Sequence, residues 1–196
     1  MYWTFPNQNV TRFDSFRSSN GNENMLLTDY GPKPFVVNIN EATKQNNTYR
    51  TALWTGAHLQ VTLMSLNVGE DIGLEMHSDV DQFLRIEQGQ GIVQMGESKE
   101  NLNFQKEVFD DSAILLPAGT WHNLTNTGRI PLKLYSIYAP PNHPFGTVHV
   151  TKADAMAMEE GYGNGNGKGI LLKEHMKQLK NGNVQENPNF FSKAKP

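Results

Sequence analysis

Two segments, GEDIGLEMHSDVDQFLRIEQG (residues 69–89) and PAGTWHNLTN (residues 117–126), are the most informative part of this chain of 196 residues. Glu75 and His77 lie two residues apart, a spacing that places both side chains on the same face of a β-strand. His122 follows a Pro-x-Gly turn in the second segment. Two imidazoles and one carboxylate on neighbouring strands suit a divalent first-row metal ion, so the two segments predict a metal site.

Gln82 is a fourth candidate for this site. It follows a polar turn at residues 78–81 and begins a second apolar run. Its amide offers a carbonyl oxygen but no charge, so it fits a metal ligand and equally a hydrogen-bonding partner of a substrate or of a metal-bound water. Asp79 and Asp81 flank the same turn. They are typical turn-forming residues, although a carboxylate there also has the chemistry of a general acid or base.

The rest of the chain up to residue 138 consists of short alternating apolar segments separated by turn signals. This pattern is typical of an all-β sandwich or barrel. The predicted strands span residues 34–40, 50–55, 58–68, 72–78, 81–88, 90–96, 104–109, 113–116, 121–126 and 131–138.

The two ends of the chain differ from this middle part. Residues 1–34 are rich in Asn, Ser and Gly with scattered aromatics, and we expect an arm that is either partly ordered or packed on the barrel or on a second subunit. The barrel is predicted over residues 35–150. The tail, residues 151–196, carries a capping-box pattern at Thr151 and Asp154 before a short helix at 155–160. A Gly-rich linker at 161–169 and a second short helix at 170–179 follow.

The spacing within the two segments resembles the two motifs of the cupin family, G-x5-HxH-x3,4-E-x6-G and G-x5-PxG-x2-H-x3-N. Three positions depart from the motifs: Glu75 replaces the first His, Gln82 replaces the Glu, and Asp111 replaces the Gly that begins the second motif. The matching positions are Gly69, His77, Gly89, Pro117, Gly119, His122 and Asn126.

The resemblance implies a double-stranded β-helix, or jelly-roll barrel, that holds a divalent transition metal, with zinc favoured and iron, manganese or nickel as alternatives. It carries the ligand roles to Glu75, His77, Gln82 and His122. Mannose-6-phosphate isomerases of the cupin class use Gln, His, Glu and His on zinc, and here Gln and Glu have exchanged positions. Cupins of this kind form homodimers, and the N-terminal arm is a natural element for exchange between subunits.

Three functions remain open at this stage. The first is a metal-dependent isomerase acting on a sugar or sugar phosphate, in which the metal polarises a substrate oxygen. Arg85 is expected to point outward, so no phosphate-binding cation is evident on the ligand strands. The second is a dioxygenase with a two-His, one-carboxylate iron site made by His77, His122 and Glu75. The third is a barrel that binds a small ligand or a metal without catalysis.

Three other histidines, His58, His143 and His149, match no motif and are expected at the surface. Tyr135 and Tyr138 lie on opposite faces of the last strand, so at most one of them faces the interior.

Composition excludes several partners. The net charge is −3 without a basic stripe, which gives no support for nucleic-acid binding. The chain has no Cys and therefore no disulfide. Its N-terminus lacks a signal-peptide pattern and no apolar stretch reaches the length of a membrane span, so we expect a cytoplasmic protein with no membrane contact.

Overall fold

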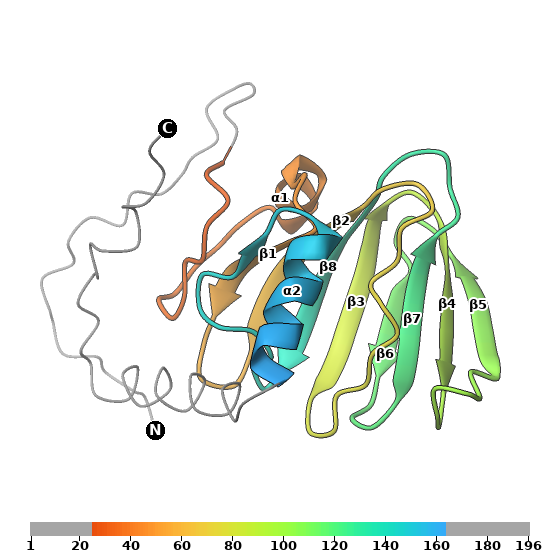
Figure 1. Cartoon of the computed structure of the whole chain (residues 1–196). Helices are drawn as coiled ribbons and strands as arrows, with labels where there is room; N and C mark the ends of the chain where they lie inside the picture. The colour runs from red at the N-terminus through yellow and green to blue at the C-terminus, as the bar shows by residue number, and fades with distance from the viewer. Residues whose placement is uncertain (1–24, 164–196) are drawn as a thin grey trace, which may run out of the picture.

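The structure is a computed structural model that describes residues 25–163, and within them it is mostly β-strand (Figure 1). Two helices accompany the strands, α1 (Ile39–Gln45) and α2 (Lys152–Gly163). The strands are β1 (Arg50–Thr55), β2 (Gln60–Leu66), β3 (Asp81–Gln88), β4 (Gly91–Gly96), β5 (Phe104–Val108), β6 (Ala113–Leu116), β7 (Trp121–Asn126), β8 (Leu132–Ala139) and β9 (Val148–His149).

The strands form two antiparallel sheets. One has six strands in the order β6-β3-β8-β2-β1-β9, and the other has three in the order β5-β4-β7. Figure 1 shows β7, β4 and β5 beside β3 and β6, so that the smaller sheet faces part of the larger one. This confirms the all-β, jelly-roll prediction, because every long strand predicted between residues 50 and 138, other than 72–78, is present.

The inner face of the larger sheet changes character along the strands. Residues directly opposite each other on paired strands share a face. One row across the sheet places Tyr138 between Gln60 and Gln82. The row four residues further along places Leu134 between Met64 and Ile86, and these belong to the main core. The barrel interior is therefore polar at one end and apolar at the other.

The main core fills the apolar end. Its members are buried side chains from both sheets and from the segments that cover them. They are Tyr49, Met64, Leu66, Ile72, Leu84, Ile86, Val93, Val108, Ile114, Leu116, Leu124, Leu132, Leu134 and Ala155, with Met95 packed against them.

A second layer covers the outer face of the larger sheet. Apolar residues of the segment before α1 pack with α1 on Leu53 and Leu63. The prediction of a strand at residues 34–40 is wrong here. Asn38 is the N-cap of α1 and its side chain accepts a hydrogen bond from the Glu41 N–H, so the chain turns into a helix. Phe35 and Val37 are partly buried against this layer without a paired strand.

The N-terminal segment is described from residue 25 onward. Met25, Leu27 and Tyr30 pack in the outer layer, and the Tyr30 ring stacks on Phe35 with ring centroids 4.4 Å apart. The part of the predicted arm that carries the other aromatics, residues 1–24, lies outside the described residues.

The segment that ends in α2 closes the barrel beside β1. The Tyr49 N–H donates to the Val150 carbonyl, and Ala155 is buried in the main core. The predicted capping box is present, because Thr151 N–H donates to the Asp154 carboxylate and Asp154 N–H donates to the Thr151 hydroxyl. As the structure has it, α2 extends to Gly163, into the range predicted as a linker.

The rest of that linker, from residue 164, and the predicted helix at 170–179 lie outside the described residues. Neither α1 nor α2 has the length and apolar character that crossing a bilayer requires.

Candidate metal centre

The segment that carries Glu75 and His77 is held against β7 by its main chain. Glu75 N–H donates to the His122 carbonyl at 3.0 Å, and His122 N–H donates to the Glu75 carbonyl at 2.9 Å. Gly119 N–H donates to the His77 carbonyl at 2.7 Å. These bonds fix the backbone of all three residues in one register, so the side chains at 75, 77 and 122 have fixed starting points.

The regular strand predicted at residues 72–78 is not formed. Asp71 and Glu75 make single bridges to β7, and no continuous ladder joins them. The reason is local, because Gly73 has a φ of 87° and its N–H donates to the Asp71 carboxylate at 2.6 Å. This turn, which a residue with a side chain rarely adopts, bends the chain between the two bridges.

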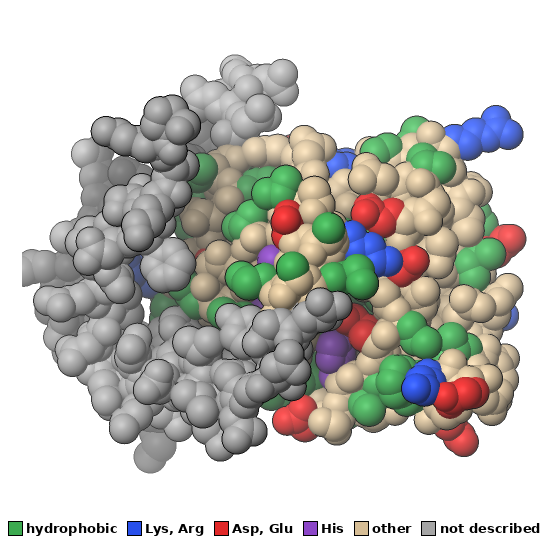
Figure 2. All heavy atoms as spheres, in the orientation of Figure 1, with side chains coloured by type: hydrophobic (Ala, Val, Ile, Leu, Met, Phe, Trp, Pro, Cys, Tyr) green, Lys and Arg blue, Asp and Glu red, His purple; other side chains and the backbone are tan. Residues whose placement is uncertain are grey.

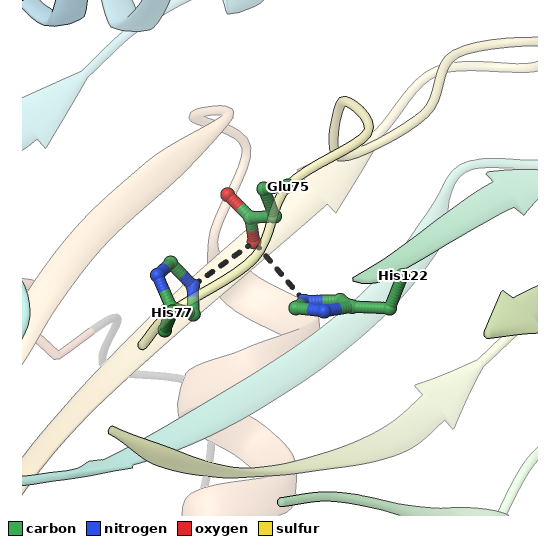
Figure 3. A group of neighbouring side chains, drawn as sticks. All are labelled: Glu75, His77 and His122. Atoms are coloured by element: carbon green, nitrogen blue, oxygen red, sulfur yellow. Dashed lines mark ion pairs between the residues drawn. The ribbon is translucent and has the colours of Figure 1, made fainter. Parts of the chain in front are cut away.

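The three side chains converge (Figure 3). The Glu75 Oε1 atom lies 3.5 Å from His77 Nε2 and 3.4 Å from His122 Nε2. One ligand atom from each residue lies within 4.8 Å of the others, a grouping compatible with a single metal ion. His122 is 2 % exposed, whereas the side chains of His77 and Glu75 are 11 % and 19 % exposed, so the centre is buried on one side and reachable on the other.

The donor atoms are in the right chemical state for a cation. His122 Nδ1 lies 2.9 Å from the Thr120 carbonyl, which can only accept, so Nδ1 carries a proton and Nε2 is the ring nitrogen available to a metal ion. Burial would raise the pKa of Glu75. The neighbouring imidazoles of His122 and His77, together with the charge of Arg50, outweigh burial and hold that pKa well below its usual range. Glu75 is therefore a carboxylate at neutral pH.

Buried polar atoms that lack hydrogen-bond partners also indicate a metal site. Buried polar atoms almost always have a hydrogen-bond partner, so a group of them without one calls for an explanation. Glu75 Oε1, His77 Nε2 and His122 Nε2 are buried and lack a hydrogen-bond partner among the described residues. A divalent ion bound to all three atoms would satisfy them together, so the residues present fit a metal.

Gln82 lies on the inner face of β3 and is 4 % exposed. Its Nε2 donates to the Ser136 hydroxyl at 3.0 Å, which leaves Oε1 as the end that can accept. That Oε1 is also buried without a partner in the described part of the chain. The structure thus places Gln82 inside the barrel with a free oxygen, and its role as fourth ligand stays a prediction.

The two aspartates of the neighbouring turn behave as turn residues. Asp81 Oδ1 accepts the Ala118 N–H at 2.9 Å and so ties the two motif turns together. The carboxylate of Asp79 lies 3.4 Å from the Ser78 hydroxyl.

Arg85 lies on the outer face of β3, as expected, and it pairs there with Asp111 and with the buried Glu87.

Two histidines were predicted at the surface and are buried. His143 is 5 % and His149 is 6 % exposed, whereas His58 is exposed as predicted. His149 is buried because β9 pairs with β1. His143 is buried because its backbone is held by the Gln60 side chain. Both contacts join residues far apart in the sequence, so the local sequence carried no signal for them.

Tyr138 is the tyrosine of β8 that faces the interior, and it is fully buried. Its ring lies edge-on to His77, with centroids 5.8 Å apart, and edge-on to His143 at 5.1 Å. Burial raises the pKa of Tyr138, so the phenol keeps its proton at neutral pH. A row of rings from His122 through His77 and Tyr138 to His143 therefore lines this part of the interior.

Arg50 is a further interior residue that the sequence reading missed. It is 1 % exposed and belongs to the polar surroundings of Glu75 and Tyr138, whose pKa values its charge lowers. An arginine at the start of an otherwise uncharged strand, Arg50–Thr55, was the available signal.

Comparison with known proteins agrees with the geometry. A family model described as "Cupin domain" matches residues 62–138, the range that includes Glu75, His77, Gln82 and His122. The uncharacterized protein YrkC of Bacillus subtilis (strain 168) is 73 % identical over 162 residues, which cover 82 % of this chain and 87 % of YrkC. The uncharacterized protein L612 of Acanthamoeba polyphaga mimivirus is 42 % identical over 119 residues, or 60 % of this chain and 72 % of L612.

Among solved structures, the crystal structure of BH2720 from Bacillus halodurans has a TM-score of 0.66 and 72 % sequence identity. The matched region covers 66 % of this chain and 98 % of the BH2720 chain. With a cupin model over the barrel and the same fold in this relative, the chain belongs to the cupin superfamily.

Proposed function

We propose that this cupin is a divalent-metal-dependent enzyme acting on a small molecule. The observation that carries the proposal is the convergence within 4.8 Å of Glu75 Oε1, His77 Nε2 and His122 Nε2, three buried donor atoms that have no hydrogen-bond partner within residues 25–163. Imidazole and carboxylate donors favour zinc, with iron, manganese and nickel as alternatives. Gln82 Oε1 is the candidate fourth ligand.

The first reaction class we propose is isomerisation of a sugar or sugar phosphate. A bound divalent ion would supply a Lewis acid for a substrate carbonyl or hydroxyl oxygen. Glu75 contributes the negative charge that holds the ion, and the buried Tyr138 ring lies edge-on to His77 beside it. The exposed sides of His77 and Glu75 leave an approach for the substrate.

The second candidate is a dioxygenase, and a separate observation favours it. The grouped side chains are two imidazoles and one carboxylate, which is the donor set of non-haem iron oxygenases. The identity of the metal separates the two candidates, because only a redox-active ion such as iron serves the second reaction.

The first test is metal analysis of protein purified without added metal. Glu75→Ala and His122→Ala are the test variants, and Asp79→Ala and His58→Ala are the matched controls outside the donor group. We expect about one metal ion per chain in the wild type and both controls, and a loss of at least tenfold in metal affinity in both test variants. Wild-type protein that stays metal-free after reconstitution would leave a non-catalytic barrel as the better reading.

The metal found then selects the activity assay. Stoichiometric zinc or manganese directs the work to aldose–ketose interconversion with a panel of sugars and sugar phosphates. Stoichiometric iron directs it to oxygen uptake with the same panel. An activity that persists unchanged in His122→Ala would contradict a metal-dependent reaction of either kind.

A further inference from the structure

The segment between β2 and β3, which carries Glu75, contains one residue more than the part of β7 beside it. Two bridges join them, Asp71 to Thr125 and Glu75 to His122, so the bridges are four residues apart on the segment and three apart on β7. One extra residue in an antiparallel pair is a β-bulge. Bulges are common next to active sites, where they redirect a side chain.

The extra residue decides which way Glu75 faces. In a regular strand, side chains alternate between the two faces, so residues 72 and 75 would lie on opposite faces. Ile72 N–H donates to the Leu124 carbonyl at 3.1 Å, and both side chains belong to the main core. Glu75, three residues later, also faces the interior, where it meets His122. Without the extra residue, either Ile72 or Glu75 would leave the interior.

Asp71 holds the extra residue in place. Gly73 has a φ of 87°, and an added Cβ there would meet no atom of the surrounding structure within 4 Å. The glycine is therefore needed for its backbone conformation and not for space. The Asp71 Oδ1 atom accepts the Gly73 N–H at 2.6 Å, which closes the turn from the residue that makes the first bridge.

The start of α2 holds Asp71 in turn. Lys152 Nζ donates to the same Oδ1 atom at 2.6 Å, and the Lys152 and Asp71 side chains are 27 % and 31 % exposed. Figure 2 shows basic and acidic side chains side by side on the face of the molecule where α2 lies in Figure 1. Because Ala155 of α2 is buried in the main core, the lysine projects from a fixed element.

From these contacts we infer that Asp71 is a positioning residue of the metal centre, and that Lys152 makes the metal affinity depend on α2. Asp71 lies outside the donor group of Glu75, His77 and His122, and it acts by holding the turn that directs Glu75 toward the two imidazoles. The inference rests on the proposed metal centre. Groups that orient metal ligands change metal affinity by about 10–100-fold when they are removed.

The test measures Co²⁺ affinity of full-length protein by visible absorption, which reports the ligands of the ion, together with urea unfolding of the metal-free protein. In Asp71→Ala we expect the affinity to fall about tenfold or more. Asp71→Asn removes the same charge but keeps an oxygen for the Gly73 N–H, so we expect a smaller loss of about threefold. Equal losses in the two variants would mean that charge, and not the turn, matters.

Lysine variants test the link to α2. Lys152→Met should weaken Co²⁺ binding by about twofold to fivefold, the range of a partly exposed ion pair, and Lys152→Arg should restore it. Removing a positive charge would by itself favour a cation, so the direction of the change is informative. Lys99→Met is the control, because Lys99 pairs with the exposed Glu100, and it should bind like the wild type.

Two glycine variants separate position from strain. Gly73 and Gly146 have φ values of 87° and 71°, and each donates its N–H to an aspartate. An added Cβ at either position meets no surrounding atom within 4 Å, so alanine should strain both turns similarly. We expect Gly73→Ala to weaken Co²⁺ binding about tenfold. Gly146→Ala should lower only the stability of the metal-free protein.

A double variant shows whether Asp71 acts through Glu75. Residues that act together have non-additive effects, whereas independent sites add. Adding Asp71→Ala to Glu75→Ala should change Co²⁺ affinity by less than about twofold. The Co²⁺ spectrum of Asp71→Ala alone should move toward that of Glu75→Ala. A residue that only stabilises the fold would change neither the spectrum nor the affinity of the folded protein.

The outcomes are separable. Absence of Co²⁺ binding in the wild type would overturn the metal centre and this inference with it. Normal wild-type binding with unchanged affinity in Asp71→Ala would overturn this inference alone, and so would equal losses in Gly73→Ala and Gly146→Ala. Unchanged binding in Lys152→Met would overturn the link to α2. If Asp71→Ala does not fold, Asp71→Asn and the two glycine variants decide the question.

Discussion

Asp111 stands at the motif position that usually holds glycine, and its backbone shows why glycine is preferred there. Its φ is 67°, the left-handed region, which Asp and Asn tolerate better than other residues with a side chain. Its N–H donates to the Ile86 carbonyl at 2.9 Å, and its carboxylate pairs with Arg85. The departure from the motif is thus accommodated by the residue's own conformational tolerance.

Substitutions at position 111 test this account. Asp111→Val should destabilise the protein by about 1–3 kcal/mol, because a β-branched residue is strained at positive φ. Asp111→Gly relieves strain but loses an exposed ion pair, so its effect should stay within about 1 kcal/mol. Urea denaturation measures both values. Equal stability of the Val variant and the wild type would contradict the account.

The buried His149 predicts a pH dependence of stability. Burial, joined by the charge of Arg50, lowers the pKa of His149 below its ordinary value of 6.5. The unfolded chain therefore takes up a proton near pH 6.5 that the folded chain does not. The stability contributed by neutral His149 is complete above that pH. It declines as the pH falls toward the lower folded pKa, by at most about 1.4 kcal/mol per pH unit.

His149→Gln removes this contribution. In urea denaturation of metal-free protein at pH 7.5, 6.0 and 5.0, the difference in unfolding free energy between wild type and variant should shrink as the pH falls. His58→Gln, at an exposed position, is the control and should show no such trend. A difference for His149→Gln that stays constant over this range would refute the prediction.

At the scale of elements, the Gln60 side chain joins β2 to the segment after β8. Its Nε2 donates to the Thr55 hydroxyl and to the His143 carbonyl, each at 2.9 Å. Its Oε1 accepts the N–H groups of Asn142 and His143. One buried amide thus provides hydrogen-bond partners for main-chain groups of Asn142 and His143. It also positions His143 against Tyr138.

Replacing Gln60 by Leu should cost about 2–5 kcal/mol of stability, because several buried polar groups lose their partners at once. Gln94→Leu is a matched control, since Gln94 makes one exposed side-chain bond to Gln105 and its loss should matter little. Thermal and urea unfolding of the two variants gives the comparison. A Gln60→Leu variant as stable as the control would show that the turn is held by other contacts.

The sequence predicted elements well where local pattern and turn chemistry agree. The strands at 81–88, 113–116 and 121–126 are short segments between turn residues, and they were found with those boundaries. Residues 34–40 alternate in polarity. They pack on the outer face of the larger sheet and pair with none of its strands, and Asn38 begins a helix. Alternation predicts which side chains are buried and not whether a partner strand exists.

The sequence also predicted part of the candidate site. Motif spacing indicated Glu75, His77 and His122, and the structure brings these side chains together. It also puts Gln82 inside the barrel. Arg50 and His149 were missed because their burial depends on the pairing of β1 with β9, about a hundred residues away. Composition and periodicity contain no information on such a contact.

At the scale of the whole molecule, the candidate ligands connect parts of the barrel that only tertiary structure brings together. His122 lies on β7 of the smaller sheet, Gln82 on β3 of the larger sheet, and Glu75 and His77 on the segment between β2 and β3. A bound ion would therefore link both sheets, and its binding energy would add to folding stability as well as to local order.

Metal removal tests this link. Saturation at about a hundred times the dissociation constant should stabilise the fold by about 2.7 kcal/mol, if the unfolded chain does not bind the ion. Chelation should lower the melting temperature of the wild type by several degrees, and that of His122→Ala much less. A chelator-induced shift of equal size in both proteins would place the stabilising ion elsewhere.

The reciprocal main-chain bonds between Glu75 and His122 have a consequence for how such a centre changes over time. The positions of these residues are set by amide and carbonyl groups that every residue type except proline possesses. A single ligand side chain can therefore be substituted without moving the backbone. A histidine in place of Glu75 would alter the charge of the site and the preferred ion while the chain keeps its path. Diversity of chemistry across one fold is an expected outcome of that division between backbone and side chain.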